Sequence, residues 1–273
     1  MEGGTFISAR RNDSFLLEHL AREDRLDEDF LKFDDSSTIK TLGIRWNAKS
    51  DFFYYAVEPS QISPSSTKRQ ILSVIAKLFD PLGWLGPVVV VAKLFMQELW
   101  ELKADWYEGI PPHILIRWNT FLRKLPQISS LKIPRWVHFS PTHQIQIHGF
   151  CDSSEKAYCG AVYMRTAASD GAVTCNLLVA KTKVAPIKKT TIPKLELCGA
   201  VLLSKLVKGI MENVTFPYEL YLWTDTSIVL GWLQKPPQTF IQPKARVFNA
   251  TQLETKTVST LYVNSTPNYI RNK

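Results

Sequence analysis

The chain has 273 residues, of which 45% are hydrophobic and 21% are charged, and eight of them are tryptophans. These values exclude a wholly disordered chain and predict buried cores, in about two domains. The net charge of +8 suits a polyanionic partner such as nucleic acid, although ordinary exposed lysines would give the same total.

No targeting or membrane segment is evident in the sequence. Residues 1–15 lack the apolar core of a secretory signal. The longest apolar stretch, Val88 to Met96, is interrupted by Lys93 and is too short to cross a bilayer. The four cysteines form no Cys-x-x-Cys pair, which favours reduced thiols. The sequence therefore predicts an intracellular protein, in the cytoplasm or nucleus, without a signal peptide or transmembrane segment.

The first 66 residues are expected to contain one helix and one β-hairpin. Residues 14–31 carry a weak helical pattern. Residues 38–46 and 51–57 alternate between apolar and polar side chains, which is typical of two paired strands. A polar loop with proline and serine at 60–66 ends this segment.

Residues 67–140 predict a small helical domain. Thr67 and Gln70 have the spacing of a capping box, which starts a helix. Pro87 takes the position that proline favours in the first turn of a helix. The three helices are expected at about 67–79, 87–102 and 113–125.

Residues 141–273 predict a mixed α/β domain, because their apolar pattern changes from helical to alternating. The expected order is strands at 144–151, 158–165 and 173–181, a helix at 190–212, a strand at 218–224, helices at 226–233 and 246–254, and a strand at 260–264. This order favours a mixed sheet that is covered by helices.

Three acids stand out in this second half. Asp152 and Asp225 each follow an apolar strand directly, and Glu196 lies one turn into the helix between them. If the two strands are neighbours, their acids share one end of the sheet, and Glu196 can reach the same end if its helix crosses the first strand. Close carboxylates repel one another unless cations lie among them, and Mg²⁺ or Mn²⁺ prefers oxygen ligands. The trio therefore predicts catalytic, metal-binding acids for phosphodiester cleavage, although a single Asp after a strand is also common in turns and caps.

Several motifs carry a resemblance to a known family. Phe150-Cys151-Asp152-Ser153-Ser154 resembles the first active-site strand of retroelement ribonuclease H domains. Residues 191–197 resemble the glutamate helix, and residues 222–232 resemble the third acid with its helix. Upstream, Phe79-Asp80-Pro81-Leu82-Gly83-Trp84-Leu85-Gly86-Pro87 is similar to the Bel/Pao class of retrotransposon polyproteins. The resemblance covers about residues 38–265.

The resemblance implies a segment of a Pol polyprotein. Residues 1–66 would be the end of a reverse-transcriptase palm with its β-hairpin, and residues 67–140 a helical thumb or connection domain. Residues 141–273 would be a ribonuclease H-like domain with a mixed five-stranded sheet, truncated at its C-terminus. The implied partners are an RNA–DNA hybrid or other nucleic acid, and the rest of the polyprotein, including reverse transcriptase and integrase. No Tyr-x-Asp-Asp motif occurs, so no DNA synthesis is predicted.

One departure from the family leaves the activity open. The family carries a fourth acid after the last strand, in an Asn-Pro-Ala-Asp motif, whereas residues 260–273 contain no acid. A non-catalytic nucleic-acid-binding module is therefore an alternative to a ribonuclease H-type endonuclease. A weaker alternative is an aspartic peptidase, since Asp225-Thr226-Ser227 partly fits its signature, but such a site needs two aspartates that share a proton.

A basic cluster precedes the glutamate helix. Its five lysines lie within 14 residues that contain no acid: Lys181, Lys183, Lys188, Lys189 and Lys194. The cluster is expected to bind the phosphates of a hybrid duplex, and the alternative is an exposed flexible loop.

Overall fold

The computed structural model describes residues 30–32, 44–47, 49–57, 65–140, 142–233 and 261–263. The chain divides into two compact units. The first comprises residues 1–62 and 120–136, and the second comprises residues 63–119 and 137–273. Within the described ranges, no helix has the length and apolar character needed to span a membrane.

The first unit contains an antiparallel four-stranded sheet. Its strands follow chain order: β1 (Phe30–Lys32), β2 (Ile44–Asn47), β3 (Phe52–Tyr55) and β4 (Ile133–Pro134). The pairing of β2 with β3 confirms the predicted hairpin. The helix predicted at 14–31 is wrong at its end, because Phe30 pairs with Asn47 as strand. Long-range pairing overrides a weak local helical pattern here, and residues 14–29 lie outside the described part.

The helices of the second unit begin close to where the sequence predicts them. They are α2 (Lys68–Ala76), α3 (Gly86–Glu101) and α4 (Pro112–Lys124), of which residues 120–124 belong to the first unit. The 3-10 helix η2 (Leu125–Ser130) follows α4 in the first unit. The capping box is present: Gln70 donates its amide N–H to Thr67 Oγ1, and Gln70 Oε1 accepts from the Thr67 amide. The proline of α3 lies in its first turn, as expected.

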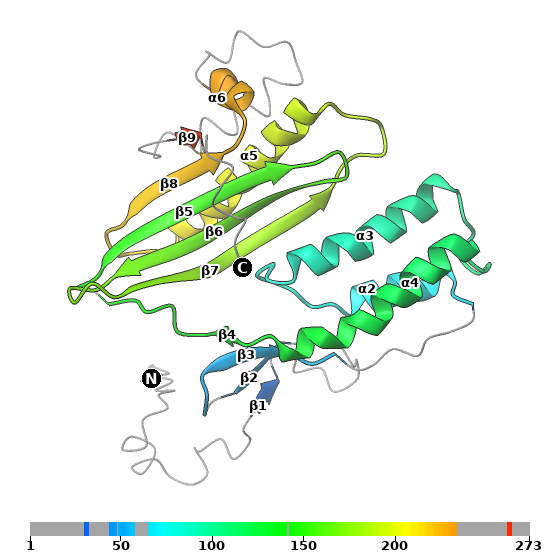
Figure 1. Ribbon diagram of the computed structural model, residues 1–273, viewed down its shortest axis with the longest axis horizontal. Coiled ribbons are helices and arrows are strands. Elements are labelled where there is room, and N and C mark those ends of the chain that lie inside the picture. The colour runs from blue at the N-terminus through cyan, green and yellow to red at the C-terminus, as the bar shows by residue number, and fades with distance from the viewer. Residues whose placement is uncertain are drawn as a thin grey trace, which may run out of the picture. The chain divides into compact units, whose positions relative to one another are not determined.

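A mixed five-stranded sheet forms the rest of the second unit (Figure 1). Its strands are β5 (Gln144–Ser153), β6 (Ala157–Ala167), β7 (Val173–Val184), β8 (Glu219–Thr224) and β9 (Leu261–Val263), in the order β7-β6-β5-β8-β9. The strands β5, β6 and β7 are antiparallel, whereas β8 runs parallel to β5 and to β9. This is the mixed sheet that the sequence predicts. The helix predicted at 246–254 lies outside the described residues.

Two helices accompany this sheet, and the longer one covers a face of it. They are α5 (Ile192–Met211) and α6 (Ser227–Leu233). Helix α5 packs against β5 and β6. The core between α5 and the sheet consists of Ile147, Cys151, Val162, Leu203, Val207, Leu220 and Leu222. Leu203 and Val207 come from α5, and the other five side chains lie at alternating positions of the strands, which is the period that the sequence shows.

The loop between α2 and α3 attaches to the free edge of the sheet. Ala180 on β7 donates its amide N–H to the carbonyl oxygen of Leu82, and Trp84 Nε1 donates to the carbonyl oxygen of Leu177. The helical segment and the sheet therefore belong to one compact unit. The two units meet at residues 62/63, 119/120 and 136/137, and the division into three domains near residues 66 and 140 stays a prediction.

Candidate metal centre

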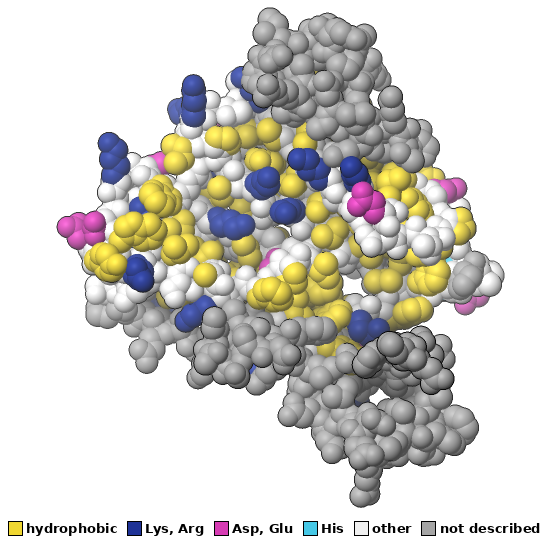
Figure 2. All heavy atoms as spheres, turned by 180° about the vertical axis from the view of Figure 1, so that it is seen from behind, with side chains coloured by type: hydrophobic (Ala, Val, Ile, Leu, Met, Phe, Trp, Pro, Cys, Tyr) yellow, Lys and Arg dark blue, Asp and Glu magenta, His cyan; other side chains and the backbone are white. Residues whose placement is uncertain are grey.

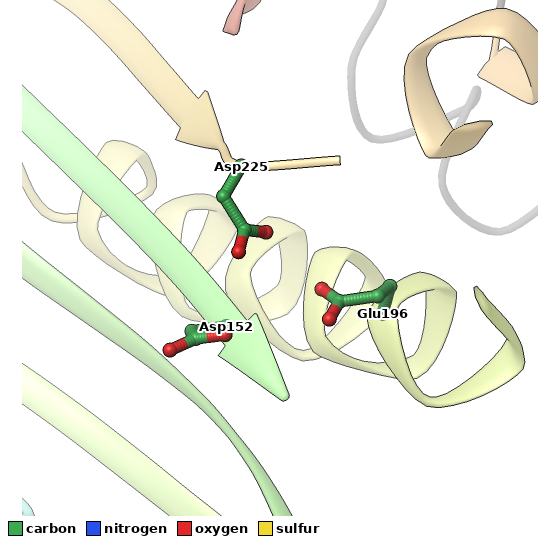
Figure 3. A group of neighbouring side chains, drawn as sticks. All are labelled: Asp152, Glu196 and Asp225. Atoms are coloured by element: carbon green, nitrogen blue, oxygen red, sulfur yellow. The ribbon is translucent and has the colours of Figure 1, made fainter. Parts of the chain in front are cut away.

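Asp152 and Asp225 lie at the same end of two neighbouring parallel strands (Figure 3). Cys151 on β5 pairs in register with Thr224 on β8, and each acid is the next residue in its strand direction. The parallel pairing follows from the α5 connection, which returns the chain to the end of the sheet at which β5 and β7 begin. Both acids are exposed, so they can reach a ligand from solvent.

Glu196 reaches this end of the sheet from α5. It lies in the second turn of the helix, after Pro193 in the first turn. The residue is only 5% exposed. Gly199, three residues further along α5, faces the backbone of Asp152. Because positions three apart lie on one side of a helix, Glu196 also faces the sheet.

The three carboxylates converge. Asp152, Glu196 and Asp225 each offer one oxygen, and these oxygens lie within 4.8 Å of one another. In the described residues, none of the three forms an ion pair with Lys, Arg or His. Glu196 Oε2 is buried and has no hydrogen-bond partner among the same residues. Within the described ranges, the cluster thus concentrates negative charge that no ion pair balances.

The electrostatics of the cluster follow from this arrangement. Burial raises the pKa of Glu196 above its ordinary value, and the charges of Asp225 and Asp152 raise it further, against an opposite effect of Ser153. Burial also raises the pKa of Asp152, and the charge of Asp225 raises it further. The Ser153 amide donates a hydrogen bond to Asp152 Oδ1 at 2.6 Å, which acts to lower this pKa. Both directions show that the ionised cluster is costly in the absence of a cation.

The donor set fits a hard divalent cation. It consists of oxygen atoms alone, which suits Mg²⁺ or Mn²⁺ better than a soft metal. The buried and unpartnered Glu196 Oε2 is the atom that most needs a positive partner. The sequence predicted this convergence of Asp152, Glu196 and Asp225, and the structure brings the three together. Their roles as metal ligands and catalytic acids stay a prediction.

Comparison with known families agrees with this picture. The family model described as "Pao retrotransposon-like RNaseH-like domain" matches residues 67–226, which is more than half of the chain. The chain belongs to this family. The match to this Pao retrotransposon-like domain begins at the cap of α2 and ends one residue after Asp225, so it includes all three acids.

Solved structures match parts of the chain at low sequence identity. The foamy viral protease-reverse transcriptase in complex with double-stranded DNA is 14% identical, with a TM-score of 0.49, and the match covers 84% of this chain and 38% of that one. The foamy viral protease-reverse transcriptase in complex with an RNA/DNA hybrid is 12% identical, with a TM-score of 0.47, and the match covers 86% of this chain and 30% of that one. Ribonuclease H1 of Halobacterium salinarum is 10% identical, with a TM-score of 0.26, and the match covers 44% of this chain and 86% of that one. The chain thus spans less than half of the foamy viral proteins. No curated protein matches the chain.

In this Pao retrotransposon-like domain, Ser153 and Cys159 lie beside the acids, and the sequence pattern did not predict either as a site residue. Ser153 Oγ is buried and makes no hydrogen bond of good geometry within the described residues, although its position favours the charged form of Glu196. Cys159 pairs across the strands with Asp152, and burial together with the Asp152 charge raises its pKa. Their positions depend on strand register and helix packing, so no local signal marks them.

The five lysines of the basic cluster lie on three consecutive elements. Lys181 and Lys183 are on β7, Lys188 and Lys189 are in the following loop, and Lys194 is in the first turn of α5, two residues before Glu196. All five are exposed. Figure 2, which views the side opposite to that in Figure 1, shows Lys and Arg side chains gathered near the middle of the molecule with few acids among them.

Proposed function

We propose that this chain hydrolyses the RNA strand of RNA–DNA hybrids at the Asp152–Glu196–Asp225 centre, with Mg²⁺ or Mn²⁺. The observation that carries the proposal is the convergence of three carboxylate oxygens within 4.8 Å, without an ion pair to any described cationic residue. The ribonuclease H-like family match supports the substrate class.

Each residue has a distinct task in this proposal. Asp152 and Asp225, at the ends of hydrogen-bonded strands, give the site a rigid base. Glu196 closes the site from the helix and would supply the buried ligand oxygen. Bound divalent ions activate water and stabilise the leaving oxygen in phosphodiester cleavage. The exposed lysines, from Lys181 to Lys194, would bind substrate phosphates beside the acids.

A cleavage assay tests this function. The full 273-residue chain is incubated with an end-labelled RNA–DNA hybrid and Mg²⁺ or Mn²⁺, with Asp152→Asn as the matched control, since this change removes a charge at nearly constant shape. We expect cleavage of the RNA strand by the wild type, loss of cleavage with EDTA, and a drop of at least about 100-fold in the variant. Wild-type cleavage no greater than that of Asp152→Asn would reject the proposal.

A non-catalytic binding module is the second candidate. The observation that favours it is that residues 264–273, which follow β9, contain no Asp or Glu, whereas the resembling enzymes carry a fourth acid there. The same preparation distinguishes the two functions when hybrid binding is measured by fluorescence anisotropy. Salt-sensitive binding without cleavage supports the binding module, and cleavage above the Asp152→Asn level excludes it.

A further inference from the structure

One stripe of helix α5 faces the sheet and includes the candidate acid. Glu196, Gly199 and Leu203 are separated by three and four residues, which places them on the same side of the helix. Glu196 and Leu203 are 5% and 3% exposed, and Gly199 is also buried. Any change in the distance between this stripe and the sheet therefore moves the Glu196 carboxylate relative to the strand ends.

The middle of the stripe lies directly over the backbone of β5 and β6. A Cβ atom added at Gly199 would lie 3.4 Å from the carbonyl oxygen of Asp152 and 3.5 Å from that of Cys159. These are ordinary van der Waals distances, so the space beside Gly199 is just sufficient for one methyl group. Helix α5 is thus in close contact with the residue whose side chain is the first acid.

The approach is closer at Gly160 on β6. A Cβ atom there would lie 3.2 Å from both the Cα and the amide nitrogen of Leu203. Backbone atoms cannot rotate away as the end of a side chain can, so α5 itself must shift by a few tenths of an ångström to admit the methyl group. The absence of a side chain at Gly160 therefore allows α5 to lie this close to the sheet.

We propose that Gly160 and Gly199 are positioning residues for the metal centre. Without side chains on β6 and α5, the helix lies close enough to the sheet for the Glu196 carboxylate to meet those of Asp152 and Asp225. The inference rests on the proposed function, because it assigns a task toward the ions of that site. Neither glycine touches an ion or the substrate, and each acts through the position of Glu196.

The expected sensitivity follows from the size of such a site. The three carboxylate oxygens lie within 4.8 Å, and two-metal sites hold their ions roughly 3.5–4 Å apart. A misplacement of about 1 Å can lower a catalysed rate by about 100-fold. A helix shift of a few tenths of an ångström is smaller, and we therefore expect a loss of about tenfold.

The chain offers a matched control on the same helix. Gly209 lies in α5, and a Cβ atom there would meet nothing within 4 Å. Gly209→Ala and Gly199→Ala both replace glycine by the better helix former within α5, so a loss that only Gly199→Ala shows reports the packing against the sheet. Gly160→Ala is the variant with the largest expected effect. All three are made in the full chain, and circular dichroism and thermal melting confirm that each one folds.

The main measurement is Mn²⁺ binding, which does not depend on cleavage. Electron paramagnetic resonance gives the affinity and the magnetic coupling between neighbouring ions. We expect Gly160→Ala to bind Mn²⁺ about tenfold more weakly and to lose the coupled signal. Gly199→Ala should bind about threefold more weakly, and Gly209→Ala should match the wild type. In the cleavage assay, kcat of Gly160→Ala should fall about tenfold while KM for the hybrid stays within about twofold.

Several outcomes would overturn the inference. The inference is wrong if folded Gly160→Ala binds Mn²⁺ with the affinity and magnetic coupling of the wild type. It is also wrong if Gly209→Ala loses as much Mn²⁺ affinity as Gly160→Ala. If Gly160→Ala fails to fold, Gly199→Ala decides, because its ordinary contact distances allow folding, and unchanged Mn²⁺ binding there rejects the role of the glycines. Failure of the proposed function looks different, since the wild type itself would then bind no Mn²⁺ or cleave no hybrid.

Discussion

The amide nitrogen of Ala180 on the edge strand β7 lies 2.8 Å from the carbonyl oxygen of Leu82, to which it donates a hydrogen bond. The next residue, Gly83, has a φ of +74°, and a Cβ atom there would lie 1.7 Å from the Ala180 carbonyl oxygen. The loop before α3 thus occupies the open edge of the sheet, which otherwise exposes unpaired backbone groups. This gives the Asp-Pro-Leu-Gly motif, Asp80 to Gly83, a physical role.

Gly83→Ala should therefore weaken the folded state. The methyl group would force a left-handed backbone on alanine and break the contact with Ala180, at a cost of roughly 2–4 kcal/mol. Urea unfolding of the full chain measures the change. Gly109→Ala is the control, because a Cβ atom at Gly109 meets nothing within 4 Å. Equal stability of the two variants would contradict a role for this loop in covering the edge.

Divalent cations should stabilise the folded chain. A ligand that binds only the native state at ten times its dissociation constant adds about 1.4 kcal/mol to the free energy of unfolding. Removal of one ligand by Asp225→Asn should abolish most of this gain. Thermal melting with and without Mn²⁺ measures it, and Glu108→Gln, an exposed acid outside the cluster, should respond like the wild type. An equal response of Asp225→Asn would place the ion elsewhere.

The metal-free chain should lose stability as the pH rises. Because the pKa values of Glu196 and Asp152 are raised above their ordinary values of 4.5 and 3.8, the unfolded chain releases these protons first. The folded state then binds more protons, so the free energy of unfolding falls as the pH rises from the ordinary values through the raised ones. Urea unfolding in EDTA between about pH 4 and pH 8 measures this. The free energy of unfolding of Glu196→Gln should depend less on pH than that of the wild type. Identical pH profiles would refute the assigned direction.

The basic cluster should control the salt dependence of hybrid binding. Changing Lys188 and Lys189 together to alanine should weaken the binding of hybrids of any sequence. The slope of log Kd against log salt should fall by about 2, if each lysine contacts one phosphate. The control changes Lys205 and Lys208, which are also exposed but lie toward the other end of α5, about 20 Å from its first turn. Equal slopes for both double variants would show that the cluster has no special role.

The cysteines should differ in reactivity toward thiol reagents. Burial raises the pKa of the Cys151 thiol to about 12, and the charges of Glu196 and Asp225 contribute. At pH 8 only about one such thiol in ten thousand is ionised, so Cys151 should stay unlabelled until the chain unfolds. Cys175 is exposed and should react first. Mass spectrometry after brief alkylation identifies the labelled residue, and early labelling of Cys151 would contradict the packing of α5 on β5.

Much of the fold and of the site follows from local patterns in the sequence. Alternation predicted the strands β5 and β8, near whose ends Asp152 and Asp225 lie, and the Thr67–Gln70 spacing predicted the cap of α2. These features were accessible because strand and helix periods, caps and turns depend on neighbouring residues alone. The order of the acids along the chain predicted their convergence on two conditions, that the two strands are neighbours and that the helix crosses the first strand.

The tertiary structure decided the features that depend on distant parts of the chain. The pairing of Phe30 with Asn47 replaced a weak helical pattern by a strand, and the Leu82–Ala180 hydrogen bond joined the helical segment to the sheet. The closeness of α5 to the sheet depends on Gly160 and Gly199, which no sequence period distinguishes from other glycines. Such contacts are set by packing between elements, where a few tenths of an ångström matter, and a local pattern carries no information about that distance.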